Sequence, residues 1–355
     1  MKEGWEVKKL GEVATYINGY AFKPAQWGEC GVPIIRIQNL NNNDALYNYY
    51  DGEIPNKYVV EYGDILISWS ASLGVYEWKG QRSYLNQHIF KVVFDKIDIN
   101  KYFLKYAVSG KLAEMLKDAH GATMKHVVKK DFDNTKIIYP PLPEQSRIVE
   151  ELDLLSNIIE KKRQQLSELD NLAQSIFYDM FGDPVTNEKG WDTRDFSKCY
   201  KLSSGDGLSA KNIIKGDFPV YGGNGIVGYH IDYNMDGEYI IIGRVGALCG
   251  NVRNVIGKAF ITDNAFILSK NVENVNVYLM YLLKIHNLRQ YAREAMQPVI
   301  SNTSLKNLRI ILPPLNLQQL FAQKIEAIEK QKALIKQSIT ETEELFNCRM
   351  DYYFN

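Results

Sequence analysis

One proline-rich segment occurs twice in this chain, and the spacing between the two copies constrains the fold. The segment 140–145 (PPLPEQ) returns 173 positions later as 313–318 (PPLNLQ). Solenoid proteins repeat every roughly 20 to 50 residues, so this spacing is too long for a stacked-repeat fold. A region of globular length precedes each copy and a long heptad-patterned stretch follows it. The chain is therefore predicted to be a duplicated module with near two-fold internal symmetry.

The two stretches behind the prolines are predicted to be long helices. Their apolar residues recur at alternating steps of four and three, the spacing that buries one side of a helix against another. Proline suits the first helical turn, and Gly182 followed by Pro184 caps and ends the first helix. At about 1.5 Å per residue each helix would be roughly 55 Å long. We expect the two to pack antiparallel within one chain, with homodimerisation as the alternative. The predicted pairing core comprises Ile148, Leu152, Leu155, Ile159, Leu166, Phe321, Ile325, Ile328, Ile335 and Ile339.

The globular halves are predicted to consist of short strands and a few helices. Strands are expected at 32–37, 64–68, 89–93, 239–242, 259–261 and 265–268, and helices near 101–118 and 276–295. A tryptophan opens each half, Trp5 and Trp191, and both are expected in the core. The fold class is thus α+β, with two globular domains separated by two long antiparallel coiled-coil helices and an internal pseudo-two-fold repeat. The predicted division is 1–139 and 184–312 for the domains, and 140–183 and 313–355 for the helices.

Composition indicates a soluble, cytoplasmic protein. The 355 residues include 45% hydrophobic and 24% charged side chains, without an apolar run long enough for a membrane span. The four cysteines are far apart, which is typical of free thiols in a reducing compartment. The net charge is zero. Lys and Arg outnumber Asp and Glu in the globular halves, and the reverse holds in the helical segments, so any DNA binding would need local patches or basic partners.

Motifs for catalysis are incomplete. The segment 223–228 (GNGIVG) fits a dinucleotide-binding pattern, but no helical periodicity follows it, so a glycine-rich loop between strands is the better interpretation. The Pro-Pro pairs lack the preceding Asn, Asp or Ser of amino-methyltransferases, because Tyr139 and Leu312 stand there. The five histidines show no metal-ligand spacing, and no carboxylate cluster suits a nuclease. The chain is predicted to have neither catalytic residues nor a metal site.

With these features the sequence resembles the specificity (S) subunits of Type I restriction–modification systems. The resemblance lies in the tryptophan-led openings, in 140–149 (PPLPEQSRIV), in 222–225 (GGNG) and in 262–266 (TDNAF). It implies two target-recognition domains that read a bipartite double-stranded DNA sequence, and helices that dock two modification (methyltransferase) subunits. Restriction subunits (endonuclease and translocase) would join them. S-adenosylmethionine, ATP and Mg²⁺ would then bind to the partner subunits, and this chain would bind no cofactor.

Base reading in the major groove needs hydrogen-bonding side chains at loop rims; Arg suits guanine, and Asn or Gln suits adenine. Such residues follow or precede the predicted strands, and Lys125 and His126 lie in a polar loop suited to phosphate. The candidate DNA-binding residues are Arg36, Gln38, Asn39, Ser68, Trp69, Ser70, Asn86, Gln87, His88, Lys125, His126, Asn224, Arg244, Asn264, Asn302 and Thr303.

Two other functional classes remain open. One is a coiled-coil scaffold whose two domains bind protein or glycan without DNA. The other is a self-contained methyltransferase or nuclease, against which the missing motifs count.

Overall fold

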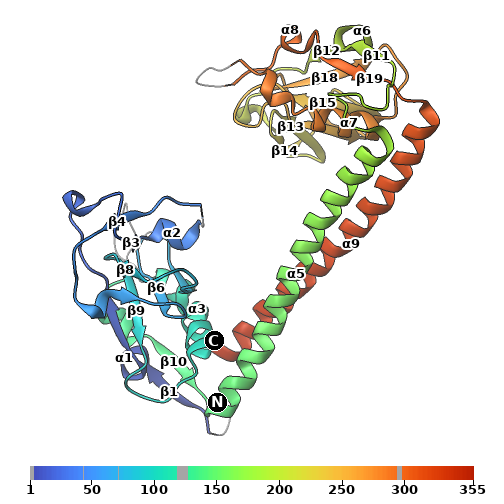
Figure 1. Cartoon of the computed structure of the whole chain (residues 1–355). Coiled ribbons are helices and arrows are strands. Elements are labelled where there is room, and N and C mark those ends of the chain that lie inside the picture. Colours follow the sequence, from blue (N-terminus) through green and yellow to red (C-terminus); the bar gives the residue numbers. More distant parts are fainter. Residues whose placement is uncertain (1–3, 43, 71, 118–126, 294–297) are drawn as a thin grey trace. The chain divides into compact units, whose positions relative to one another are not determined.

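The computed structural model describes residues 4–42, 44–70, 72–117, 127–293 and 298–355. The chain forms two compact units, Met1–Lys161 with Ser338–Asn355, and Lys162–Gln337. The boundary falls within both long helices, α5 (Leu142–Phe181) and α9 (Leu315–Phe354), so each unit holds one part of each helix (Figure 1). None of the described helices is long and apolar enough to cross a membrane.

The first unit combines three sheets with short helices. Its sheets, each in spatial order, are β1(Glu6–Lys9)-β10(Lys136–Tyr139), β2(Thr15–Asn18)-β9(Ile89–Val93)-β6(Ile65–Ser68)-β7(Gly74–Glu77) and β4(Asn48–Tyr50)-β3(Val32–Ile35)-β8(Ser83–Leu85)-β5(Val59–Val60). Its helices besides the long pair are α1(Leu10–Val13), α2(Ile37–Asn41), α3(Lys101–Lys117) and α4(Lys129–Asn134).

The second unit repeats this arrangement. Its sheets are β11(Thr193–Asp195)-β19(Arg309–Ile311), β12(Tyr200–Ser204)-β18(Ala265–Lys270)-β15(Glu238–Gly243)-β16(Val252–Ile256) and β14(Gly225–His230)-β13(Phe218–Gly222)-β17(Phe260–Ile261). Its helices besides the long pair are α6(Phe196–Cys199), α7(Asn276–Ile285) and α8(Asn302–Leu305). Parallel pairing occurs at the same place in both units, between β3 and β8 and between β13 and β17. The internal repeat inferred from the sequence is therefore present in the sheet topology.

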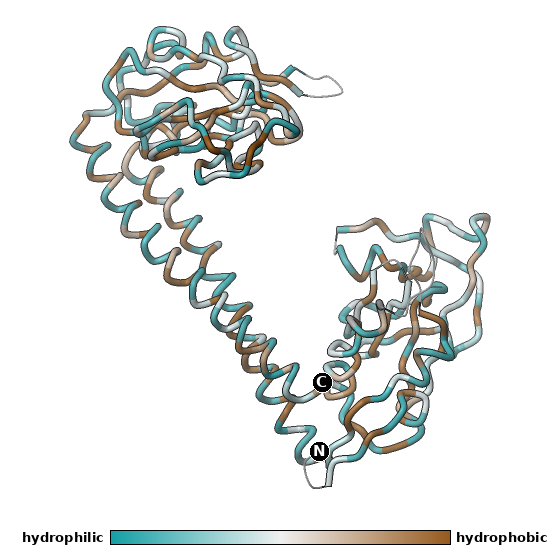
Figure 2. Tube along the Cα trace, turned by 180° about the vertical axis from the view of Figure 1, so that it is seen from behind, coloured by the Kyte–Doolittle hydropathy of each residue, from teal (hydrophilic) through white to brown (hydrophobic). Residues whose placement is uncertain are grey.

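Hydrophobic residues concentrate on the strands and on one side of each long helix, as Figure 2 shows for each unit. In the first unit, one hydrophobic cluster contains Ile148 and Leu152 of α5, Tyr353 of α9 and residues of β9. In the second, Phe177 of α5 and Phe321 of α9 pack edge to face with ring centroids 5.6 Å apart. Burial of these aromatic rings in one cluster stabilises the helix ends against the domain.

Within each unit the two helices run antiparallel. In the first unit the guanidinium of Arg349 bonds the Glu151 carboxylate, and Arg147, one turn earlier on α5, lies over the ring of Tyr353, one turn later on α9. In the second unit Lys332 Nζ lies 2.7 Å from Asp170 Oδ1.

The residues predicted for the pairing core are buried or half-buried. Buried members are Ile148, Leu152, Leu155, Phe321, Ile325, Ile328 and Ile339, and half-buried members are Ile159, Leu166 and Ile335. The spacing of four and three continues through Leu169 and Ala173 to Ile176 and Met180, and at these last two positions it is one residue off. Phe177 and Phe181 are fully buried there, whereas Ile176 and Met180 are only partly buried. At this end of α5 the packing of two large aromatic rings in the core of the second unit determines which side of the helix is buried.

Both long helices begin with the same buried glutamine. Gln145 Nε2 donates to the Pro140 carbonyl at 2.8 Å, and its Oε1 accepts from the Asn100 N–H at 2.9 Å. Gln318 does the same with the Pro313 carbonyl at 2.8 Å and the Val275 N–H at 3.0 Å. A proline carbonyl and a buried backbone N–H would otherwise lack partners. The repeated sequence motif is thus a hydrogen-bonding device that fixes each helix to its domain.

Three local expectations were wrong. The strand predicted at 32–37 ends at Ile35, and α2 follows it. The helix predicted at 276–295 ends at Ile285, where Asn287 adopts a left-handed φ of 46°. Trp5 and Trp191 are half-buried and pack against the two cores rather than lying inside them.

His286 is expected to make the second unit less stable in acid. Its side chain is 2% exposed, and neither ring nitrogen has a hydrogen-bond partner among the described residues. Burial lowers the pKa of His286 from the usual 6.5. Below about pH 6.5 the imidazole of His286 is protonated in the unfolded chain but stays neutral in the folded unit. The free energy of unfolding therefore decreases as the pH falls below about 6.5.

The check is thermal unfolding followed at several pH values. His286→Leu should flatten the acid side of the profile, whereas His88→Asn, at an exposed position, should leave its shape unchanged. An unaltered acid slope in His286→Leu would show that other groups control it.

Candidate nucleic-acid interface

Arg36 and Gln38 lie at a rim of the first domain. The Arg36 guanidinium lies 4.7 Å from the Trp27 ring centroid and donates from Nη1 to Asn48 Oδ1 at 3.1 Å. Gln38, exposed on α2, donates from Nε2 to the Leu46 carbonyl at 3.3 Å. Hydrogen bonds therefore orient both side chains, and both retain hydrogen-bonding groups at the surface of the domain.

Asn39 is only 4% exposed. Its Oδ1 accepts from the Arg36 N–H at 3.0 Å, and its Nδ2 donates to the carbonyls of Ala45 and Leu46 at 3.2 and 3.3 Å. All of its hydrogen-bonding atoms are used inside the domain, so in this structure Asn39 shapes the loop.

Trp69 follows the end of β6 and is half-buried. Its Nε1 donates to Asn18 Oδ1 at 3.0 Å, and its ring stacks on Phe90 at a centroid distance of 5.6 Å. The exposed His88, whose φ is 73°, packs its ring 4.9 Å from the Trp69 ring. These side chains form one cluster where β2 and β6 end and β9 begins.

The other candidates near this cluster are more enclosed. Ser68 and Ser70 are buried, and the Ser68 hydroxyl donates to the Ser72 carbonyl. Asn86 and Gln87 are half-buried in the turn before β9. The Oδ1 of Asn86 is buried without a hydrogen-bond partner among the described residues. Lys125 and His126 lie outside the described residues.

In the second domain, Arg244 follows the end of β15. Its guanidinium lies 5.3 Å from the Phe266 ring centroid and donates from Nη1 to Ser204 Oγ at 3.4 Å. The backbone N–H of Arg244 donates to the carbonyl of the exposed Asn264 at 2.9 Å. The structure therefore brings two sequence-predicted residues, Arg244 and Asn264, into direct contact.

The remaining candidates of this domain lie on neighbouring turns. Asn224 is exposed in the turn between β13 and β14, and its carbonyl accepts from Arg253 at 3.1 Å. Asn302 and Thr303 are exposed on α8, where Asn302 Nδ2 donates to the Leu202 carbonyl at 3.3 Å. The strand β14 follows the turn, so the expectation of a glycine-rich loop between strands is correct.

Asn18 and Ser204 are not among the candidate residues predicted from the sequence. Each is the last residue of its strand, exposed, and the hydrogen-bond acceptor of a candidate side chain on another strand. Nothing local distinguishes either residue from an ordinary loop residue. Only the strand register brings Asn18 to Trp69 and Ser204 to Arg244.

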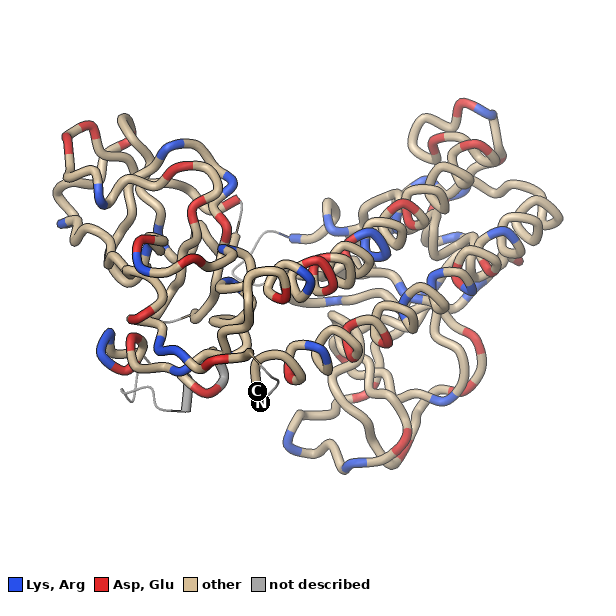
Figure 3. Tube along the Cα trace, turned by 90° about the horizontal axis from the view of Figure 1, so that it is seen from below, with Lys and Arg blue, Asp and Glu red and all other residues tan. Residues whose placement is uncertain are grey.

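Charge is mixed around these sites. Figure 3 shows Lys and Arg interspersed with Asp and Glu along both long helices and on each globular part. Mixed charge gives only a weak general attraction for a polyanion. The described residues also contain no group of three or more His, Cys, Asp or Glu that could hold a metal ion.

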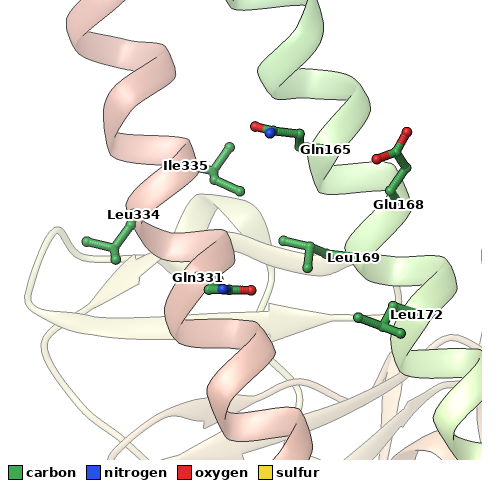
Figure 4. A pocket seen from close by; sticks show the side chains of 7 residues that line it. All are labelled: Gln165, Glu168, Leu169, Leu172, Gln331, Leu334 and Ile335. Carbon is green, nitrogen blue, oxygen red and sulfur yellow. The ribbon is translucent and has the colours of Figure 1, made fainter.

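A groove of about 540 Å³ lies between α5 and α9 in the second unit. Figure 4 shows its lining side chains, Gln165, Glu168, Leu169, Leu172, Gln331, Leu334 and Ile335. Leu334 is 67% exposed and Leu172 is 48% exposed. The groove therefore leaves two leucines of the helix pair accessible to solvent.

Comparison with known proteins identifies relatives over nearly the whole chain. The family model described as Type I restriction modification DNA specificity domain matches residues 2–171 and 188–344. The specificity subunit of the Type I restriction enzyme EcoprrI from Escherichia coli is 27% identical, with 90% of this chain and 86% of that protein covered.

Solved structures show the same fold. The S subunit of a Type I restriction–modification system from M. genitalium aligns with a TM-score of 0.59 and 14% identity, over 99% of this chain and 96% of that one. A chain from a structure of a Type I R-M system, described for complex assembly and conformational transition, aligns with a TM-score of 0.60 and 17% identity. That alignment covers 100% of this chain and 98% of the other.

Proposed function

The chain belongs to the Type I restriction modification DNA specificity family, and from this premise we propose that its two domains read the two halves of a bipartite double-stranded DNA target. The observation that carries the proposal is one sheet framework present twice, with unlike side chains at the corresponding rims. A shared frame positions the contacts, and differing loop residues give each half its own sequence preference.

Hydrogen bonds to base edges would come from the rim residues that keep exposed hydrogen-bonding groups. In the first domain these are Arg36, Gln38 and His88, and in the second they are Asn224, Arg244, Asn264, Asn302 and Thr303. Arg pairs with the acceptors of guanine, and Asn or Gln pairs with adenine in the major groove. The enclosed candidates Asn39, Ser68 and Ser70 would shape the loops that present these groups.

We further propose that the long helices set the spacing between the half-sites and dock two modification (methyltransferase) subunits, to which restriction subunits are added. The open groove beside Leu334 supports a docking role, because its lining mixes exposed leucines with amide and carboxylate groups. In this assignment the chain supplies specificity without performing chemistry. S-adenosylmethionine, ATP and Mg²⁺ would act on the partner subunits.

The proposal is tested by methylation mapping after the chain is co-expressed with a Type I methyltransferase (modification) subunit from the same genome. We expect a methylated bipartite motif that disappears when this chain is omitted. If the methyltransferase is bound and folded but no motif appears, the DNA role is wrong and a protein- or glycan-binding scaffold becomes the better interpretation.

Leu334→Glu is expected to weaken methyltransferase binding while leaving the fold intact. The side chain is 67% exposed, so folding buries little of it, whereas a docked subunit would have to bury the new carboxylate. The loss should be roughly tenfold or more in affinity, measured by titrating the methyltransferase. Val185→Glu, at another exposed apolar residue of the second unit, is the matched control. Equal affinities for both variants would place docking elsewhere.

A further inference from the structure

Positions 69 and 244 occupy the same place in the two domains. The Trp69 N–H donates to the His88 carbonyl at 3.2 Å, and the Trp69 carbonyl accepts from the Val127 N–H at 3.1 Å. The Arg244 N–H donates to the Asn264 carbonyl at 2.9 Å, and its carbonyl accepts from the Ile300 N–H at 2.9 Å. In each domain these bonds join the end of one central strand to the start of its neighbour and to the segment before α4 or α8.

The side chains at these positions have matching surroundings. Trp69 stacks on Phe90 and bonds Asn18, and strand register pairs Asn18 with Phe90. Arg244 lies over Phe266 and bonds Ser204, and register pairs Ser204 with Phe266. A ring below and a strand-end acceptor beside it are therefore common to both sites. The sites differ in the side chain itself and in its neighbour, because the His88 ring also packs 4.9 Å from the Trp69 ring whereas Asn264 stands at the corresponding place beside Arg244.

The chemistry of the two side chains differs in a way that DNA can detect. The indole of Trp69 has one donor, which is already bonded to Asn18. The guanidinium of Arg244 has five N–H donors, and among the described residues its only hydrogen bond is the long one from Nη1 to Ser204 Oγ at 3.4 Å. Its Nε is buried without a hydrogen-bond partner among the described residues. The Phe266 ring thus orients the Arg244 guanidinium, which still has N–H donors that form no hydrogen bond within the described part of the domain.

Resting on the proposed DNA function, we infer that positions 69 and 244 are the corresponding base-reading positions of the two domains. Arg244 selects guanine through the paired acceptors N7 and O6. Trp69 offers a ring and no free donor, so it selects a thymine through apolar contact with the methyl group. Asn18 and Ser204 are positioning residues that hold the two side chains at the rim.

The test is methylation mapping of the complete complex on a library of randomised half-sites. Arg244→Ala should reduce discrimination for guanine by about 10- to 100-fold at one position of one half-site only. Trp69→Ala should relax a thymine position in the other half-site, at the corresponding distance from the methylated base. Arg194→Ala removes an exposed arginine on β11 and should leave both half-sites unchanged.

Arg244→Lys separates base reading from phosphate binding. It keeps the charge and the stem but loses the planar fork, so we expect it to lose the guanine preference as well. If Arg244→Lys restores normal specificity and Arg244→Ala weakens all sequences alike, Arg244 contacts phosphate and the inference is wrong. An unchanged motif in both variants also overturns it. Absence of any motif with the unaltered chain would instead contradict the proposed function.

Discussion

Leu152→Glu is expected to destabilise the first unit by at least about 3 to 5 kcal/mol, the upper range for removing a buried leucine. Leu152 of α5 is fully buried in a hydrophobic cluster with residues of α9 and the strands, so the new carboxylate would be removed from water. Typical domains are stable by only about 5 to 15 kcal/mol. Loss of the helix pair should therefore accompany loss of methyltransferase assembly.

Thermal unfolding and hydrogen exchange measure this effect, and two variants sharpen it. Leu154→Glu changes a side chain that is 61% exposed on the same helix and should be nearly neutral. Ile328→Asp places the charge in the core of the second unit, so exchange should rise there first. Normal melting and assembly of Leu152→Glu would disprove the paired-helix core.

Gln145→Leu is expected to destabilise the first unit by about 2 to 6 kcal/mol. Leucine has a similar size but bonds neither the Pro140 carbonyl nor the Asn100 N–H. Two buried backbone groups would then lack partners, at about 1 to 3 kcal/mol each. Gln318→Leu should do the same in the second unit, through Pro313 and Val275.

Denaturant unfolding of the two variants and of the exposed Gln164→Leu checks this prediction. Equal stabilities of all three would mean that the buried glutamines contribute little beyond their volume. Hydrogen exchange at the Asn100 and Val275 amides gives a local readout, because each amide loses its acceptor in only one variant.

The long helices could be predicted because their determinants are local. Proline before the first turn, a glycine cap with φ of 74° at Gly182 and a heptad spacing all act over a few residues. The register failed only where Phe177 and Phe181 contact a sheet built from distant segments. Likewise α2 was missed because the apolar run 32–37 looks like one continuous strand.

The recognition candidates were harder to judge from sequence. A polar residue at a strand end predicts a loop group, but burial and partners depend on residues far along the chain. Asn39 illustrates this, because its amide is used by the loop that it closes. Arg244 and Asn264 are joined by a backbone hydrogen bond across strands, which their spacing does not indicate.

By itself the sequence determined the duplication, the two helices and the glutamine that anchors each of them. Only the tertiary structure decided which recognition residues correspond. Asn18 and Trp69 are 51 residues apart, whereas Ser204 and Arg244 are 40 apart, so no constant shift aligns them. Loops between strands change length at little cost, while the hydrogen-bonded register of the sheet stays fixed. The spacing of apolar residues along a helix can therefore be recognised within a short stretch of sequence. The correspondence of positions 69 and 244 can be recognised only from the paired strands.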